Sequence, residues 1–116
     1  MKMNHVDVDI FIIHYKKLTE RKQSILSQFK KYNISNYEFI EIDRDELHEH
    51  NTDIFDKKFG NALTAISLSH YFAYKKIIES YDNALIFEDD VILEDNFINI
   101  LEKYLIELPS DYDVLF

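Results

Sequence analysis

The sequence predicts an α/β fold in which a mostly parallel sheet carries helices on both of its faces. Short runs of β-branched and aromatic residues alternate along the chain with longer segments in which apolar residues recur at helical spacing. The expected order is strand, helix, strand, loop, helix, strand, helix and strand, and crossovers of this kind connect parallel strands. With 116 residues, of which 47% are hydrophobic, the chain has room for a single packed domain.

The first half of the chain is expected to form a strand, a helix, a second strand and a loop. Val6 to Tyr15 is a β-rich run, and Thr19 after it is the expected N-cap of a helix whose apolar stripe includes Ile25. Tyr37 to Ile42 is typical of a second strand. Residues 46–59 are polar and irregular, so we expect them to form a loop.

The second half is expected to contain two helices, a strand between them and a strand after them. Asn61 to Tyr81 is the longest helical segment, and Asp95 is the expected N-cap of a shorter helix that Pro109 ends. We expect the buried face of the long helix to contain Leu63, Ile66, His70, Tyr74, Ile77, Ile78 and Tyr81. Asp113 to Phe116 would begin a further strand, so we expect residues 1–116 to be one α/β domain that is incomplete at its C-terminus. An unpaired terminal strand would favour self-association.

Three adjacent acids follow the apolar run at residues 84–87. Glu88, Asp89 and Asp90 would lie at the carboxyl edge of the sheet, where open α/β sheets bind ligands. One interpretation is a site for a divalent cation, because hard oxygen ligands suit such ions and a bound ion offsets the repulsion among the acids. In extended backbone Glu88 and Asp90 would point to one side and Asp89 to the other. The other interpretation is a solvated turn, which is the commoner structure for such a triplet on its own.

The composition excludes several classes of site and partner. The net charge of −9 disfavours nucleic acid or an anionic membrane as a partner. The absence of cysteine excludes a thiolate metal site and a catalytic thiol. A single glycine is too few for a dinucleotide fingerprint or a P-loop, so a metal and side chains would have to hold any phosphates. The apolar run Ile10 to Ile13 is too short for a signal peptide or a membrane span, and we therefore expect a cytoplasmic protein.

Four segments, read together, resemble the amino-terminal part of glycosyltransferase family 25. They are Ile13-His14-Tyr15 at a strand end, Thr19-Glu20-Arg21 after it, Ser69-His70-Tyr71 in a helix, and Leu85 to Val91 around the acids. The family includes lipopolysaccharide-biosynthesis sugar transferases and procollagen galactosyltransferases. The resemblance implies a glycosyltransferase A-type (Rossmann-like) half-domain, a donor such as UDP-galactose or UDP-glucose, and Mn²⁺ or Mg²⁺ held by the acids.

The resemblance also implies which residues form the site. Glu88, Asp89 and Asp90 match the family's metal motif, and Asp90 with one of the other two would hold the ion. The residues that match donor-binding positions are His14, Tyr15, Arg21, Asp43, Ser69 and His70. The carboxylate that would act as general base on the acceptor hydroxyl is unassigned.

Three functions are open at this point. The first is metal-dependent transfer of a hexose, galactose or glucose, from a UDP-sugar to a hydroxyl of a glycan, a lipopolysaccharide or a protein hydroxylysine. The second is a truncated, non-catalytic domain that binds a metal, a nucleotide sugar or another protein. The third is a structural α/β domain with a solvated acidic turn. Donor binding separates the third from the others, and turnover separates the first from the second.

Overall fold

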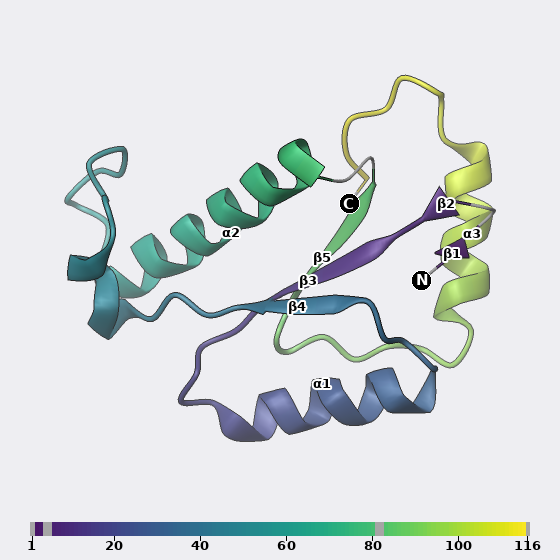
Figure 1. The fold of residues 1–116 in the computed structure, drawn as a ribbon, viewed down its shortest axis with the longest axis horizontal. Coiled ribbons are helices and arrows are strands. Elements are labelled where there is room, and N and C mark those ends of the chain that lie inside the picture. The colour runs from purple at the N-terminus through teal and green to yellow at the C-terminus, as the bar shows by residue number, and fades with distance from the viewer. Residues whose placement is uncertain (1, 4–5, 81–82, 116) are drawn as a thin grey trace.

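The main sheet of the protein is parallel, as the sequence predicts. The computed structural model describes residues 2–3, 6–80 and 83–115. In chain order its elements are β1 (Lys2–Met3), β2 (Val6–Asp7), β3 (Asp9–Ile13), α1 (Thr19–Lys31), β4 (Tyr37–Ile40), η1 (Arg44–Glu49), α2 (Asn61–Ser80), β5 (Ala84–Glu88) and α3 (Phe97–Glu107). Within the described residues the main sheet has the strand order β4-β3-β5, and β3 pairs in parallel with both neighbours (Figure 1).

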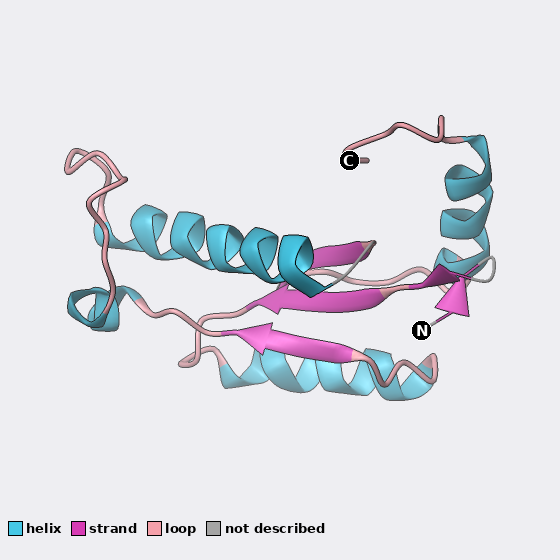
Figure 2. Cartoon of the chain, turned by 45° about the horizontal axis from the view of Figure 1, so that its top comes forward, coloured by secondary structure: helices cyan, strands magenta, loops and turns pink. Residues whose placement is uncertain are grey.

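Helices lie on both faces of this sheet, which confirms the second part of the predicted fold. Figure 2 shows α1 below the sheet and α2 above it. Because successive strand residues point to opposite faces, β3 contributes to two cores. The core on the α1 face contains Ile10, Ile12, Ile25, Phe29 and Ile34. The core on the α2 face contains Phe11, Ile13, Ile40 and Ala73.

The predicted strand from Val6 to Tyr15 is wrong in its extent. β2 separates from β3 and pairs with β1 in a small antiparallel sheet, and β3 ends at Ile13. The backbone N–H of Tyr15 is directed to the Asp89 carboxylate at 3.3 Å, so a side chain takes the place of a strand partner. The predicted strand from Tyr37 to Ile42 is also too long, because Ile40 pairs with the last residue of β3.

The predicted N-caps of two helices are each displaced by one residue. Leu18 occupies the N-cap position of α1, so Thr19 is the first helical residue, and Asn96 caps α3 in place of Asp95. The carboxylate of Asp95 instead accepts a hydrogen bond of 2.8 Å from the hydroxyl of Tyr32. A tertiary contact therefore uses the side chain that the sequence predicts as a cap. The predicted loop at residues 46–59 likewise begins within the short 3₁₀ helix η1.

The end of α1 has a well-defined capping geometry that directs the chain into β4. Asn33 has a φ of 56°, in the left-handed region that asparagine tolerates better than most residues. The N–H of Asn33 donates to the carbonyl of Lys30 at 3.3 Å, and that of Ile34 donates to the carbonyl of Phe29 at 2.8 Å. This is the Schellman arrangement, in which the two residues after the cap satisfy carbonyls of the last turn.

The prediction for the buried face of α2 is wrong for most of its residues. The buried residues are mostly small, and they are Thr64, Ala65, Leu68, Ser69 and Ala73. The predicted residues Leu63, Ile66, Tyr74 and Ile78 are exposed, and Tyr81 lies outside the described residues. His70 and Ile77 are partly buried, and Ile77 packs against the core on the α2 face. Small side chains allow a helix to approach a sheet closely. A prediction from periodicity instead assigns the large apolar residues to the buried face.

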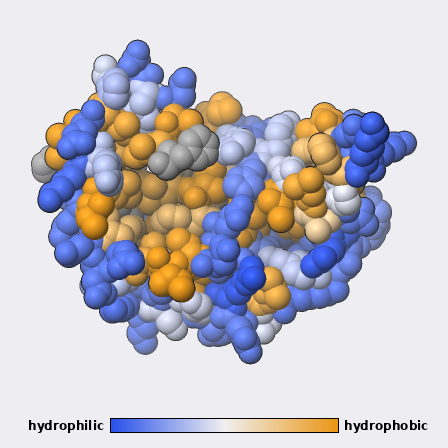
Figure 3. Space-filling view, turned by 180° about the vertical axis from the view of Figure 1, so that it is seen from behind, coloured by the Kyte–Doolittle hydropathy of each residue, from blue (hydrophilic) through white to orange (hydrophobic). Residues whose placement is uncertain are grey.

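The side of the molecule near β5 and α3 is the least covered. Every residue of α3 is described and none of them is fully buried, and the residues Ala84 to Phe87 of β5 are only partly buried. Figure 3, a view from behind, shows apolar side chains gathered around a hollow in this region. No helix in the described part of the chain is long and apolar enough to cross a membrane.

The predicted strand at Asp113 to Phe116 is wrong for its described residues. Residues 113–115 have no regular structure, and Phe116 lies outside the described residues. The nearby Tyr112 hydroxyl donates to the side-chain oxygen of Asn83 at 2.6 Å, which ties this segment to the start of β5 by a side chain. Self-association through a terminal strand stays a prediction.

Two substitutions on α2 test which of its faces is buried. Ala73 has no exposed surface, so Ala73→Leu should overpack the core and cost about 1–3 kcal/mol of unfolding free energy. Ile78 is 83% exposed, so Ile78→Ala should change it by less than about 0.5 kcal/mol. Urea unfolding measures both. A loss of about 2 kcal/mol or more in Ile78→Ala, the value for a buried position, would support the face predicted from periodicity instead.

Candidate functional site

A pocket lies at the carboxyl edge of the sheet. The chain leaves β3 for β4 through α1 on one face, and it returns through α2 on the other face to β5. The strand order therefore reverses at β3, and ligands of α/β proteins bind outside the strand ends at such a switch point. The pocket has a volume of about 200 Å³. It is lined by Ile13, His14, Tyr15, Leu18, Arg21, Ile42, Arg44, Ala62, Ala65, Ile66, Ser69, Glu88, Asp89 and Asp90.

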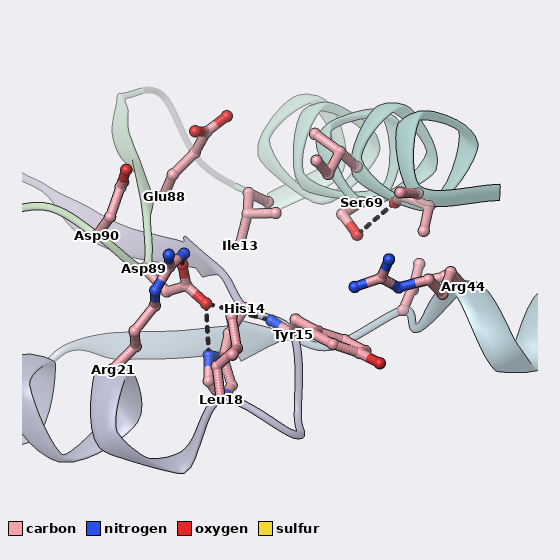
Figure 4. Close-up of a pocket in the computed structure, with 14 residues that line it drawn as sticks. Ile13, His14, Tyr15, Leu18, Arg21, Arg44, Ser69, Glu88, Asp89 and Asp90 are labelled. Carbon is pink, nitrogen blue, oxygen red and sulfur yellow. Dashed lines mark hydrogen bonds and ion pairs between the residues drawn. The ribbon is translucent and has the colours of Figure 1, made fainter. Parts of the chain in front are cut away.

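Asp89 is the most heavily bonded side chain of this edge. It is only 7% exposed, and its Oδ2 lies 2.8 Å from Nδ1 of His14. The same oxygen accepts the backbone N–H of Tyr15 at 3.3 Å, and Oδ1 accepts an N–H of Arg21 at 3.0 Å (Figure 4). Asp89 thus connects the end of β5 to the end of β3 and to the first turn of α1.

The surroundings of Asp89 favour its ionised form. Burial by itself would raise the pKa of the carboxyl group. The hydrogen bonds from His14, Arg21 and the Tyr15 N–H, together with the charge of Arg21, act in the opposite direction and leave the pKa of Asp89 below its usual value. The carboxylate is therefore charged, buried and already satisfied by three protein donors.

Glu88 and Asp90 differ from Asp89 in that both are exposed. They point away from Asp89, as expected for alternating side chains. Glu88 has one protein partner near it, Nε2 of His70 at 3.3 Å. The three acids also form a turn, because the N–H of Val91 donates to the carbonyl of Glu88 at 3.2 Å. The backbone is therefore a turn at the end of β5, and whether the acids bind a divalent cation stays a prediction.

The segment after the acids is fixed to α1 by one side-chain amide. Nε2 of Gln28 donates to the carbonyl of Val91 at 3.0 Å, and Oε1 of Gln28 accepts the N–H of Leu93 at 2.6 Å. This pair of bonds replaces the two that a neighbouring strand would make. It holds the backbone directly after Asp90 at a fixed position beside the pocket.

Four of the six predicted donor-binding residues line the pocket beside the acids, and they are His14, Tyr15, Arg21 and Ser69. The side chain of His14 is fully buried, and its Nε2 has no hydrogen-bond partner, with the nearest carboxylate oxygen of Glu41 at 3.8 Å. Tyr15 contributes its ring to the pocket wall, and its hydroxyl lies 3.5 Å from Asp45. Arg21 lines the pocket while it is paired with Asp89.

Ser69 has its hydroxyl engaged within its own helix, and the remaining two predicted donor-binding residues lie outside the lining. Ser69 lines the pocket, but its hydroxyl donates to the carbonyl of Ala65 at 2.8 Å within α2. Asp43 is buried outside the lining, and its Oδ1 accepts the backbone N–H of Lys16 at 3.2 Å. His70 is absent from the pocket lining, is half-buried, and lies beside Glu88 at the end of β5. Asp43 and His70 therefore support the site without lining it.

Arg44 lines the pocket and was not expected from the sequence. It is the first residue of η1, and its guanidinium carbon lies 4.7 Å from the ring centroid of Tyr15. Its place directly after Asp43, near the end of the second strand, is the signal that could have identified it, because strand ends of a parallel sheet share one edge.

The acids present here suit a divalent cation only in part. Within the described residues there is no group of three or more histidine and acidic side chains placed to hold a metal ion. Glu88 and Asp90 are exposed carboxylates on the pocket wall, whereas Asp89 is occupied by protein donors. Two carboxylates are sufficient for Mg²⁺ or a similar ion when phosphate oxygens and water complete its coordination.

Comparison with known proteins places the chain in a family. The family model of glycosyltransferase family 25 (LPS biosynthesis protein) matches residues 7–115. The chain belongs to this family. A protein of Acanthamoeba polyphaga mimivirus named "Putative glycosyltransferase R655" is 28% identical over 108 residues, covering 85% of this chain and 33% of the viral protein. The chain therefore spans about a third of the length of this family relative, and the resemblance recognised in its motifs is confirmed.

Replacement of Asp89 by asparagine should lower the free energy of unfolding and make that free energy less dependent on pH. An asparagine offers one acceptor oxygen and turns an NH₂ group towards N–H donors, which should cost about 1–3 kcal/mol. Because folding lowers the pKa of Asp89, its contribution is complete above the unfolded carboxyl pKa of about 3.9 and is lost as pH falls through the lower folded value.

Urea unfolding at about pH 7 and about pH 3 tests this linkage. The difference in stability between wild type and Asp89→Asn should be largest at the higher pH and should shrink at the lower one. Glu79→Gln, at an exposed carboxylate of α2, is the control and should follow the wild type. A constant difference between wild type and Asp89→Asn at both pH values would contradict the expected role of the charge.

Proposed function

We propose that this chain forms the donor-binding part of a metal-dependent glycosyltransferase. The donor is a UDP-sugar, and the group transferred is a hexose, galactose or glucose. The acceptor is a hydroxyl of a glycan, a lipopolysaccharide or a protein hydroxylysine. Membership of glycosyltransferase family 25 supports glycosyl transfer in general, and the proposal adds the metal, the donor and the acceptor.

The observation that carries the proposal is the distribution of charge around the pocket. Glu88 and Asp90 offer exposed carboxylates on one side, where Arg21 is paired with Asp89, and Arg44 lies on the other side near η1 (Figure 4). A nucleoside diphosphate is itself an anion, so two exposed acids would repel it unless a cation lay between them. A site with acids on one wall and Arg44 on the other suits an anionic ligand that binds together with a cation.

Different residues of the pocket would have different roles in donor binding. Glu88 and Asp90 would hold the ion, and Asp89 would keep both of them oriented through its bonds to His14 and Arg21. A divalent cation on the diphosphate oxygens supplies charge stabilisation as the glycosidic bond breaks. The ring of Tyr15 and the neighbouring apolar residues would exclude water from the donor.

Thermal unfolding with UDP, in the presence and absence of Mn²⁺, tests the donor site. A ligand that binds only the folded state raises stability by about 2.7 kcal/mol at a hundredfold excess over its Kd. UDP should therefore raise the Tm of the wild type when Mn²⁺ is present and much less when it is absent. Glu88→Ala and Asp90→Ala should each lose most of the shift.

The matched control is Glu79→Ala, which removes an exposed carboxylate of α2 that is not part of the pocket lining. It should keep the full shift with UDP and Mn²⁺. An equal shift in Asp90→Ala and Glu79→Ala would show that Asp90 has no role in metal binding. No shift in the wild type would favour a structural domain with a solvated acidic turn.

A second candidate is a domain that binds the donor without catalysing transfer. The carboxylates on the pocket wall are Glu88, Asp89 and Asp90, within the described residues. If two of them hold a cation and Asp89 stays in its network, this wall offers no carboxylate as general base for the acceptor. Stoichiometric binding of UDP-galactose or UDP-glucose with no release of UDP, with acceptors supplied, would favour this candidate over the enzyme.

A further inference from the structure

Arg44 is held in the pocket by an aromatic ring and not by an acid. Its guanidinium carbon lies 4.7 Å from the centroid of the Tyr15 ring, a cation–π distance. The backbone that carries the Tyr15 ring is itself restrained, because the N–H of Tyr15 donates to Asp89. Figure 4 shows the Arg44 guanidinium pointing into the space between Tyr15 and Ser69. Stacking on a ring fixes the plane of the guanidinium and leaves its N–H groups available at the edge.

The two arginines of the pocket differ in how far their charge is compensated. Arg21 donates to the buried carboxylate of Asp89 at 3.0 Å, so the two charges largely cancel. Within the described residues the guanidinium of Arg44 has no hydrogen bond or ion pair. Its acidic neighbour Asp45 is instead paired with Lys17, and this pairing is the main cause of the lowered pKa of Asp45, to which the charge of Arg44 adds less.

We propose that Arg44 is the residue that binds the diphosphate of the donor. The inference rests on the proposed function and adds to it a residue that neither the motifs nor the family resemblance assigned. A planar guanidinium with free N–H groups matches phosphate oxygens in a bidentate way. Arg44 lies on the pocket wall, carries a charge that no described acid pairs with, and is oriented by Tyr15 before any ligand binds.

Because Arg44 lies against the Tyr15 ring, diphosphate binding by Arg44 should depend on that ring. Loss of the ring should leave the charge in place but free the arginine side chain to move, and ordering such a side chain on binding costs about 0.5–1.5 kcal/mol. Tyr15→Leu should therefore weaken diphosphate binding less than loss of the arginine does. Tyr15→Phe, which keeps the ring, should bind UDP more tightly than Tyr15→Leu does.

Isothermal titration with UDP, uridine and inorganic pyrophosphate, each with Mn²⁺, tests the assignment. A hydrogen bond to a charged group contributes about 1.5–3 kcal/mol, so Arg44→Gln should weaken UDP and pyrophosphate about 10–100-fold and leave uridine unchanged. Arg44→Lys, which keeps the charge without the planar fork, should be intermediate. Arg44 is exposed, so these variants should unfold at the same urea concentration as the wild type.

Lys75→Gln is the control, because it removes an exposed cation of α2 that is not part of the pocket lining. Wild-type affinity for UDP in Arg44→Gln would overturn the inference, and so would an equal loss of UDP and uridine. If the wild type binds pyrophosphate but not UDP, and Arg44→Gln abolishes pyrophosphate binding, then Arg44 does bind diphosphate but the proposed UDP-sugar donor is wrong. If the wild type binds none of the three probes, both proposals are wrong.

Discussion

The hydrogen bonds that converge on the Asp89 carboxylate hold the functional edge of this protein together. They come from His14 and Tyr15 after β3 and from Arg21 in α1, so one side chain connects three elements. A buried carboxylate is stable only when protein donors replace the water it has lost, and each of these donors also needs its acceptor. Asp89 and its donors therefore depend on one another, and their hydrogen bonds fix the direction in which Glu88 and Asp90 point.

The helix α1 serves both the core and the site. Its Ile25 and Phe29 pack on the sheet, while Arg21 and Gln28 beside them bind Asp89 and the segment after the acids. The acidic turn is thus attached to the helix on both of its sides. This arrangement means that a change in the packing of α1 would be transmitted directly to the residues that face the pocket.

The opposite wall of the pocket is built by different forces. α2 approaches the sheet through small residues, which places Ala65 and Ser69 against the pocket, and η1 brings Arg44 over the ring of Tyr15. These contacts are van der Waals and cation–π in character, whereas the wall near β5 depends on charged hydrogen bonds. On one wall of the pocket the charge of Asp89 is therefore compensated by Arg21. On the other wall the positive charge of Arg44 is available for a ligand.

The sequence by itself determined the class of fold, the order of the main strands and helices, and the edge at which the acids lie. These follow from local periodicity and from strand alternation, which act over a few residues and placed Glu88 and Asp90 on one side. The motifs also identified the family correctly. Only the tertiary structure decided that Asp89 is occupied by protein donors, that the small face of α2 is the buried one, and that Arg44 reaches the pocket. Each of these depends on groups far apart in the chain, such as Asp89 and His14, which periodicity cannot relate because it carries no information on long-range contacts.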